Sequence, residues 1–94
     1  ILGIGLFVAA AAANANLSAE YFSPAASPYS CTVSASDIQD VRPFWANWGP
    51  PVDVFAPGAQ VLSAWIGPNN DETAIADGTS MATPHVAGLV AYLL

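Results

Sequence analysis

The stretch Gly78-Thr-Ser-Met-Ala-Thr-Pro-His-Val-Ala-Gly88 is the most informative part of the sequence. It places a serine, Ser80, directly after a glycine turn and at the start of an apolar segment that predicts a helix over residues 80–94. Alanine, valine and leucine leave this helix little polar face, so we expect it to be largely buried. Free N–H groups at a helix N-terminus can stabilise negative charge that develops on a hydroxyl. The residues alone therefore allow two roles for Ser80, a helix N-cap or a nucleophile.

The N-terminal residues 1–13 form a continuously apolar run. A membrane-spanning helix needs about 20 such residues, so the run is too short to cross a bilayer. A secretory signal peptide is one interpretation, because Ala13-Asn14-Ala15 fits a small-x-small cleavage site, although the run has neither a basic start nor a Met. The other interpretation is a strand buried on both faces of a parallel sheet. The residues alone leave both open.

Three further short strands are predicted, over residues 31–35, 52–56 and 61–66. Turn-rich segments with proline and glycine separate them. Residues 67–77 are polar, and we expect them to be exposed.

The composition excludes several classes of partner. The chain has 94 residues, one basic residue (Arg42) and seven acidic ones, which gives a formal net charge of −6. Such a chain lacks the basic patch that nucleic-acid phosphates or anionic lipids require. Only 9% of the residues are charged and 54% are hydrophobic, which is typical of the interior of a larger protein. Together with the start at Ile1, this composition predicts a fragment.

The string from Gly78 to Gly88 resembles the active-serine signature of the subtilisin-like serine proteases, the subtilases, and most closely their proteinase K-like branch. The resemblance extends back over nearly the whole chain, through Ser23-Pro-Ala25, Asn47-Trp-Gly49, Val52–Gly58 and Leu62–Gly67. It implies an α/β fold, a part of the subtilisin-like three-layer sandwich with a mostly parallel sheet and a central buried helix that starts at the nucleophile. Residues 1–94 would then be the C-terminal part of a catalytic domain, with residues 7–14 as a buried strand and its following turn.

The resemblance implies a serine endopeptidase that hydrolyses polypeptides through an acyl-enzyme. Ser80 matches the nucleophile, and Asn14 matches the asparagine whose side-chain amide donates to the oxyanion beside the Ser80 N–H. Removing one such donor costs about 10²–10³ in turnover in this family. Taken alone, Asn14 could also be a simple turn residue. The segment Ala11-Ala12-Ala13 would line one wall of the substrate pocket, with Ala13 where the family has glycine.

The general base of such an enzyme is missing from the sequence. The family order is Asp, then His, then Ser, and neither an Asp-Thr-Gly nor a His-Gly-Thr-His string occurs here. His85 follows Ser80 by five residues, and we expect it to be a core histidine that is hydrogen-bonded to a neighbour. The chain in isolation is therefore expected to be inactive.

The resemblance also implies a structural calcium ion, and no cofactor for catalysis. Asp53 matches the calcium-binding aspartate, and the two backbone carbonyls that complete the site fall on Pro28 and Ser30. In an apolar strand a lone carboxylate is costly, so the alternative is that Asp53 accepts hydrogen bonds from turn N–H groups. Cys31, the one cysteine, matches a half-cystine whose partner would lie beyond Leu94; the alternative is a buried free thiol.

The expected setting is a secreted, extracellular enzyme, with a vacuolar one as the alternative, and the expected partners are polypeptide substrates. Neither nucleic acid nor membrane is expected to bind, and the full-length protein is expected to be monomeric. Two other functions remain open at this point. One is a non-catalytic, truncated subtilase remnant. The other is a small secreted structural protein with an N-terminal signal peptide.

Overall fold

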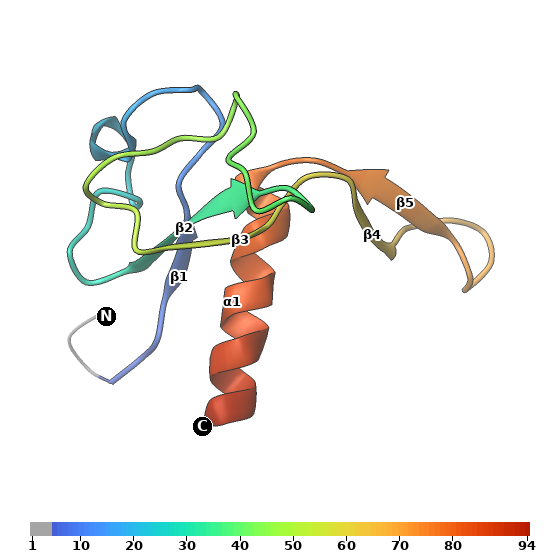
Figure 1. Ribbon diagram of the computed structural model, residues 1–94. Coiled ribbons are helices and arrows are strands. Elements are labelled where there is room, and N and C mark those ends of the chain that lie inside the picture. The colour runs from blue at the N-terminus through green and yellow to red at the C-terminus, as the bar shows by residue number, and fades with distance from the viewer. Residues whose placement is uncertain (1–4) are drawn as a thin grey trace.

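The computed structural model describes residues 5–94 of the chain, so the first four residues of the apolar N-terminal run lie outside the described part. Figure 1 shows a small sheet with one long helix beside it and a separate hairpin. In chain order the elements are β1 (Ala9–Ala11), the 3-10 helix η2 (Ala19–Tyr21), β2 (Cys31–Ser36), β3 (Val54–Pro57), β4 (Val61–Ala64), β5 (Thr73–Ala76) and α1 (Thr79–Leu93).

A three-stranded parallel sheet forms the centre of the molecule. Its order is β1-β2-β3, with Ala10 opposite Thr32 and Ala35 opposite Ala56. Within the described residues, β2 has a neighbour on both sides and is buried from Thr32 to Ala35. The sheet confirms the parallel arrangement and the strands predicted over residues 31–35 and 52–56. It also confirms the strand interpretation of the N-terminal run for residues 9–11.

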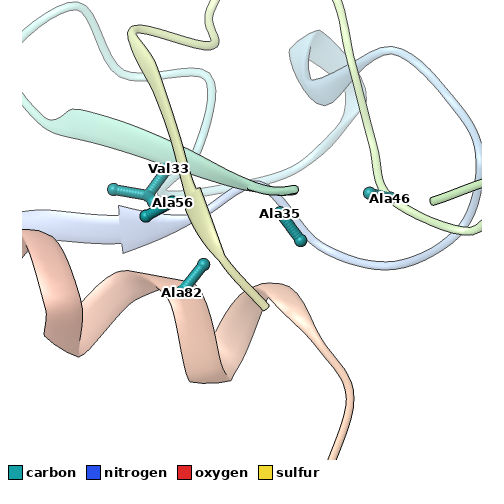
Figure 2. Packing of buried hydrophobic residues seen from close by; sticks show 5 residues of the cluster. All are labelled: Val33, Ala35, Ala46, Ala56 and Ala82. Carbon is teal, nitrogen blue, oxygen red and sulfur yellow. The ribbon is translucent and has the colours of Figure 1, made fainter. Parts of the chain in front are cut away.

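The core between the sheet and α1 is built from small side chains. Its buried members are Val33, Ala35, Ala46, Ala56 and Ala82. Figure 2 shows the Ala82 side chain directed from α1 toward the strands. Because alanine adds only a methyl group, the helix can approach the sheet closely, and α1 contacts all three strands. The position of the N-terminus of α1 is therefore fixed by the sheet.

The prediction that the C-terminal helix is largely buried is wrong. Of the residues in α1 only Thr79 and Ala82 are buried, while Leu89 is 56% and Tyr92 86% exposed. A helix that packs on one small sheet covers only one stripe of its surface, and no other element within residues 5–94 covers the remainder. No helix in the described part of the chain is long and apolar enough to cross a membrane.

An antiparallel hairpin leads directly into α1. It pairs β4 with β5, with Val61 opposite Ala76 and Ala64 opposite Thr73, and it projects away from the parallel sheet. The first strand was predicted, although it ends two residues earlier than expected. The second strand was not predicted, because its four residues are too short and too mixed in character to give a clear alternation. Their pairing with β4 is what makes them a strand.

Asp53 is exposed and precedes β3, so the expectation of a costly carboxylate within an apolar strand is wrong. Its Oδ2 accepts a hydrogen bond from the Thr32 N–H at 2.8 Å, and its own N–H donates to the Thr32 carbonyl at 2.9 Å. The neighbouring Cys31 is a half-buried free thiol. Burial raises the pKa of Cys31, and the negative charge of Asp53 raises it further.

Replacing Asp53 by Asn should therefore lower the pKa of Cys31 and speed its alkylation by iodoacetamide at pH 8, where the thiolate is the minor form. The rate measured by mass spectrometry should rise in Asp53→Asn. It should stay unchanged in Asp37→Asn, which removes a half-buried carboxylate just beyond the other end of β2. Equal rates in the wild type and in Asp53→Asn would contradict the electrostatic coupling.

Candidate functional site

Ser80 stands at the second position of α1, with its side chain exposed. The N-cap residue of the helix is Gly78, so the N-cap interpretation of Ser80 is wrong. No hydrogen bond engages the Ser80 hydroxyl within residues 5–94. The first N–H groups of a helix have no intrahelical acceptor, so the Ser80 N–H is also available. A free hydroxyl thus lies beside free backbone donors.

The turn after β1 lies against the start of α1 through two hydrogen bonds to Thr79. The Thr79 N–H donates to Asn14 Oδ1 at 2.8 Å, and the Ala13 N–H donates to Thr79 Oγ1 at 3.1 Å. Thr79 is fully buried, whereas the Asn14 side chain is exposed. Because the amide oxygen of Asn14 is bound to Thr79, its NH₂ group is left to donate elsewhere. The structure therefore brings Asn14 to the residue that precedes Ser80.

Ala13 has a left-handed backbone, with φ of 79°. Alanine in this region costs about 1 kcal/mol or more relative to glycine. Ala11 and Ala13 are half-buried, but Ala12 is fully buried and packs with Ala19 and Ala25. The Ala12 side chain is therefore taken up by the core, and its place in a substrate pocket stays a prediction. Ala11 and Ala13 remain candidates for such a wall.

Asn47 also contacts the site, although its sequence motif did not indicate a role for it. It is fully buried, and its side chain bonds to residues on both sides of Asn14. The sequence signal that could have found it is an amide placed between Trp45-Ala46 and Trp48, since a polar group among apolar residues needs internal partners when it is buried.

A mostly apolar cavity of about 380 Å³ lies between the hairpin and the first turns of α1. Ser80 is part of its wall, so the serine lies next to a mostly apolar surface. The lining residues are Val61, Leu62, Ser63, Ala64, Trp65, Ala74, Ala76, Ser80, Met81, Pro84 and His85.

His85 lies in the wall of the same cavity, but its Nδ1 is 2.9 Å from the Met81 carbonyl oxygen. The predicted hydrogen bond to a neighbour is thus confirmed. The predicted burial is wrong, because His85 is exposed. No hydrogen bond joins His85 to Ser80 in this part of the protein. Residues 5–94 therefore contain no group positioned as a base for Ser80.

The residues expected to bind calcium, Asp53, Pro28 and Ser30, would do so through oxygen atoms alone. Asp53 Oδ2 is bound to the Thr32 N–H, and Oδ1 has no hydrogen-bond partner within residues 5–94. In the same range, no backbone or side-chain donor engages the carbonyls of Pro28 and Ser30. The described residues contain no group of three or more His, Cys, Asp and Glu side chains that could hold a metal. Carboxylate and carbonyl oxygens of this kind suit calcium.

The sequence is similar to known proteases along nearly its full length. The profile of the Subtilase family matches residues 3–94. Subtilisin-like proteinase Mp1 of Magnaporthiopsis poae is 52% identical over 88 residues, 94% of this chain and 22% of that protein. The cuticle-degrading protease of Metarhizium anisopliae is 50% identical over 93 residues, 99% of this chain and 23% of that protein. The chain thus spans less than a quarter of the length of these relatives.

The fold is similar to that of a solved protease as well. A cold-adapted subtilisin-like serine proteinase superposes with a TM-score of 0.82 at 47% sequence identity, over 89% of this chain and 30% of that one. The parallel sheet with α1 packed against it is therefore a part of the subtilisin-like α/β fold. From the serine at the start of α1, the asparagine beside it and these similarities together, we conclude that the chain belongs to the subtilase family.

Proposed function

We propose that this chain is the nucleophile-bearing part of a serine endopeptidase that acts on polypeptides. The observation that supports the proposal is the hydrogen bond from the Thr79 N–H to Asn14 Oδ1, because it holds an exposed carboxamide at the residue that precedes Ser80. The base would come from a histidine outside residues 1–94. The subtilase relatives, which are several times longer than this chain, support that arrangement.

In the proposed reaction, Ser80 Oγ attacks the carbonyl carbon of the scissile peptide bond and passes its proton to the histidine. The carbonyl oxygen becomes an oxyanion, which accepts hydrogen bonds from the Ser80 N–H and from the Asn14 NH₂ group. The intermediate collapses to an ester on Ser80 as the amine leaves with the proton from the histidine. Water then gives a proton to the histidine and attacks the ester carbonyl, and Ser80 Oγ leaves with that proton as the acid product is released. These steps use only side chains and backbone groups.

The proposed setting is extracellular, with a monomeric full-length enzyme. The name of the cuticle-degrading relative supports an external substrate for that protein, and the 50% identity makes the same setting reasonable here. A vacuolar enzyme and a non-catalytic remnant are the alternatives. The remnant would have the same sheet and helix, but no partner segment with the base.

The chain of 94 residues, purified alone, should not hydrolyse peptides and should not react rapidly with a fluorophosphonate probe, because no base activates Ser80. In the full-length protease the probe should label Ser80 to one equivalent, and Ser80→Ala should abolish both labelling and hydrolysis. Mass spectrometry of the labelled peptide checks both cases. Stoichiometric labelling of the isolated chain, or hydrolysis by full-length Ser80→Ala, would contradict the proposal.

We also propose that Asp53 and the carbonyls of Pro28 and Ser30 hold a structural calcium ion. This site is supported by Asp53 Oδ1 and by the carbonyls of Pro28 and Ser30, because none of these oxygens accepts a hydrogen bond within residues 5–94. When bound, the ion would neutralise the Asp53 carboxylate and join residues 28–30 to the start of β3. It would take no part in the chemistry at Ser80.

Chelation of calcium should lower the thermal midpoint of the full-length enzyme, and Asp53→Asn should remove most of that sensitivity. Binding at 100 times Kd is worth about 2.7 kcal/mol. Added calcium should also speed the alkylation of Cys31, because the cation offsets the Asp53 charge that raises the pKa of Cys31. Asp37→Asn serves as the control and should keep both responses. If Asp53→Asn keeps them too, any calcium that binds does so elsewhere.

Ala13 is proposed to restrict the substrate pocket. Where the family has glycine, the Ala13 methyl group stands on a left-handed backbone next to Asn14. A pocket that rejects a large group through one methyl discriminates by about 1–3 kcal/mol. The enzyme should therefore prefer smaller residues before the scissile bond.

In the full-length enzyme, Ala13→Gly should raise kcat/KM for substrates with Phe before the scissile bond about tenfold more than for those with Ala. It should also raise the thermal midpoint, because glycine removes the strain at φ of 79°. A parallel rise for both substrates would locate the effect in the oxyanion site. No change in either would show that Ala13 does not face the substrate.

A further inference from the structure

Asn47 combines full burial with hydrogen bonds at both polar atoms of its side chain. It is 0% exposed and lies in the loop between β2 and β3, far in sequence from the residues that it contacts. A buried carboxamide costs free energy unless both its donor and its acceptor are satisfied. In Asn47 both are satisfied by one short segment, the turn that follows β1.

The side chain of Asn47 makes three hydrogen bonds to this turn. Its Oδ1 accepts from the Ala15 N–H at 2.9 Å and from the Leu17 N–H at 3.0 Å. Its Nδ2 donates to the Ala12 carbonyl at 2.8 Å. A carboxamide is suited to this task because it carries an acceptor and a donor on one planar group.

The backbone of Asn47 adds a contact to the same turn. Its N–H donates to the Ala13 carbonyl at 3.0 Å, next to the left-handed φ of 79°. Residues in such a conformation persist when the surrounding structure holds them there. The bonds to Ala12 and Ala13 precede Asn14, and those to Ala15 and Leu17 follow it. The backbone of Asn14 is therefore fixed from both sides.

Asn14 itself is exposed, and Thr79 is the one residue that binds its side chain within the described chain. The direction of its free NH₂ group thus depends on two supports: the bond to Thr79, which holds the amide oxygen, and the anchored turn, which holds the Cα atom. A donor helps a transition state only when it is already aimed at the position of the developing charge.

We propose that Asn47 is the positioning residue for the oxyanion donor Asn14. Asn47 does not touch the substrate; it acts by fixing the turn that carries Asn14. This inference rests on the proposed function, since it assigns a task within the same site. A purely structural Asn47 would stabilise the fold and leave turnover per folded enzyme unchanged.

The test is a double-mutant cycle in the full-length protease, with kcat normalised by titration of the acylated serine. Asn47→Ala should lower kcat about 10- to 100-fold with less than a threefold change in KM, because misplacement of a catalytic group by about 1 Å can cost 10² in rate. Asn14→Ala should lower kcat about 10²–10³-fold. In the Asn14→Ala background, Asn47→Ala should then change kcat less than threefold, since its target is already gone.

Two further variants separate positioning from stability. Asn47→Asp keeps the shape and both acceptor bonds but replaces the donor by a carboxylate oxygen that repels the buried Ala12 carbonyl, so it should lower kcat per titrated site by a loss that also vanishes in the Asn14→Ala background. Thr32→Val removes a buried hydroxyl that bonds to the Ala25 carbonyl at 2.6 Å and to the Ser30 hydroxyl at 3.2 Å, and that has no bond to the turn. It should lower the thermal midpoint and leave kcat per titrated site unchanged.

The inference is overturned if the Asn47 variants lower only the thermal midpoint, or if their losses multiply with that of Asn14→Ala. These outcomes differ from a failure of the proposed function, because that failure would appear as hydrolysis by Ser80→Ala.

Discussion

The pair of hydrogen bonds between Thr79 and the Ala13-Asn14 turn is the interaction on which the site depends. It joins the end of β1 to the start of α1, and both of its bonds are made by one fully buried residue. The bond to the amide oxygen decides which end of the Asn14 side chain is free. The sheet and the alanine core support this contact by holding α1 at a fixed depth against the three strands.

Much of the site could be predicted because its signals are local. The serine after a glycine turn, the apolar helix and the short strands each follow from a few adjacent residues, and the motif from Gly78 to Gly88 resembled one family over its whole length. The prediction that Asn14 lies near Ser80 followed only from that resemblance. On residue type alone Asn14 is indistinguishable from a turn asparagine, and its bond to Thr79 joins residues 65 positions apart.

The remainder depends on what surrounds each residue, which a local pattern does not contain. The composition of α1 is that of a buried helix, but a helix is buried only where other elements cover it. Most of α1 is exposed here. The chain spans only 22% of the Magnaporthiopsis poae relative. Asp53 was assigned to a strand that begins one residue later. Asn47 appeared in a motif without a role, because its importance lies in partners 30 to 35 positions earlier.

The topology has a consequence for how the molecule folds. All pairings in the main sheet are parallel, and the contact that completes the site closes a loop of 65 residues. Non-local contacts are gained only after the entropy of loop closure has been lost, so such chains fold slowly compared with helical bundles of equal size. Asn14 and Thr79, the residue before Ser80, therefore meet late, after the strands between them have paired. Until that moment the exposed strand edges and the apolar side of the helix are open to association with other chains.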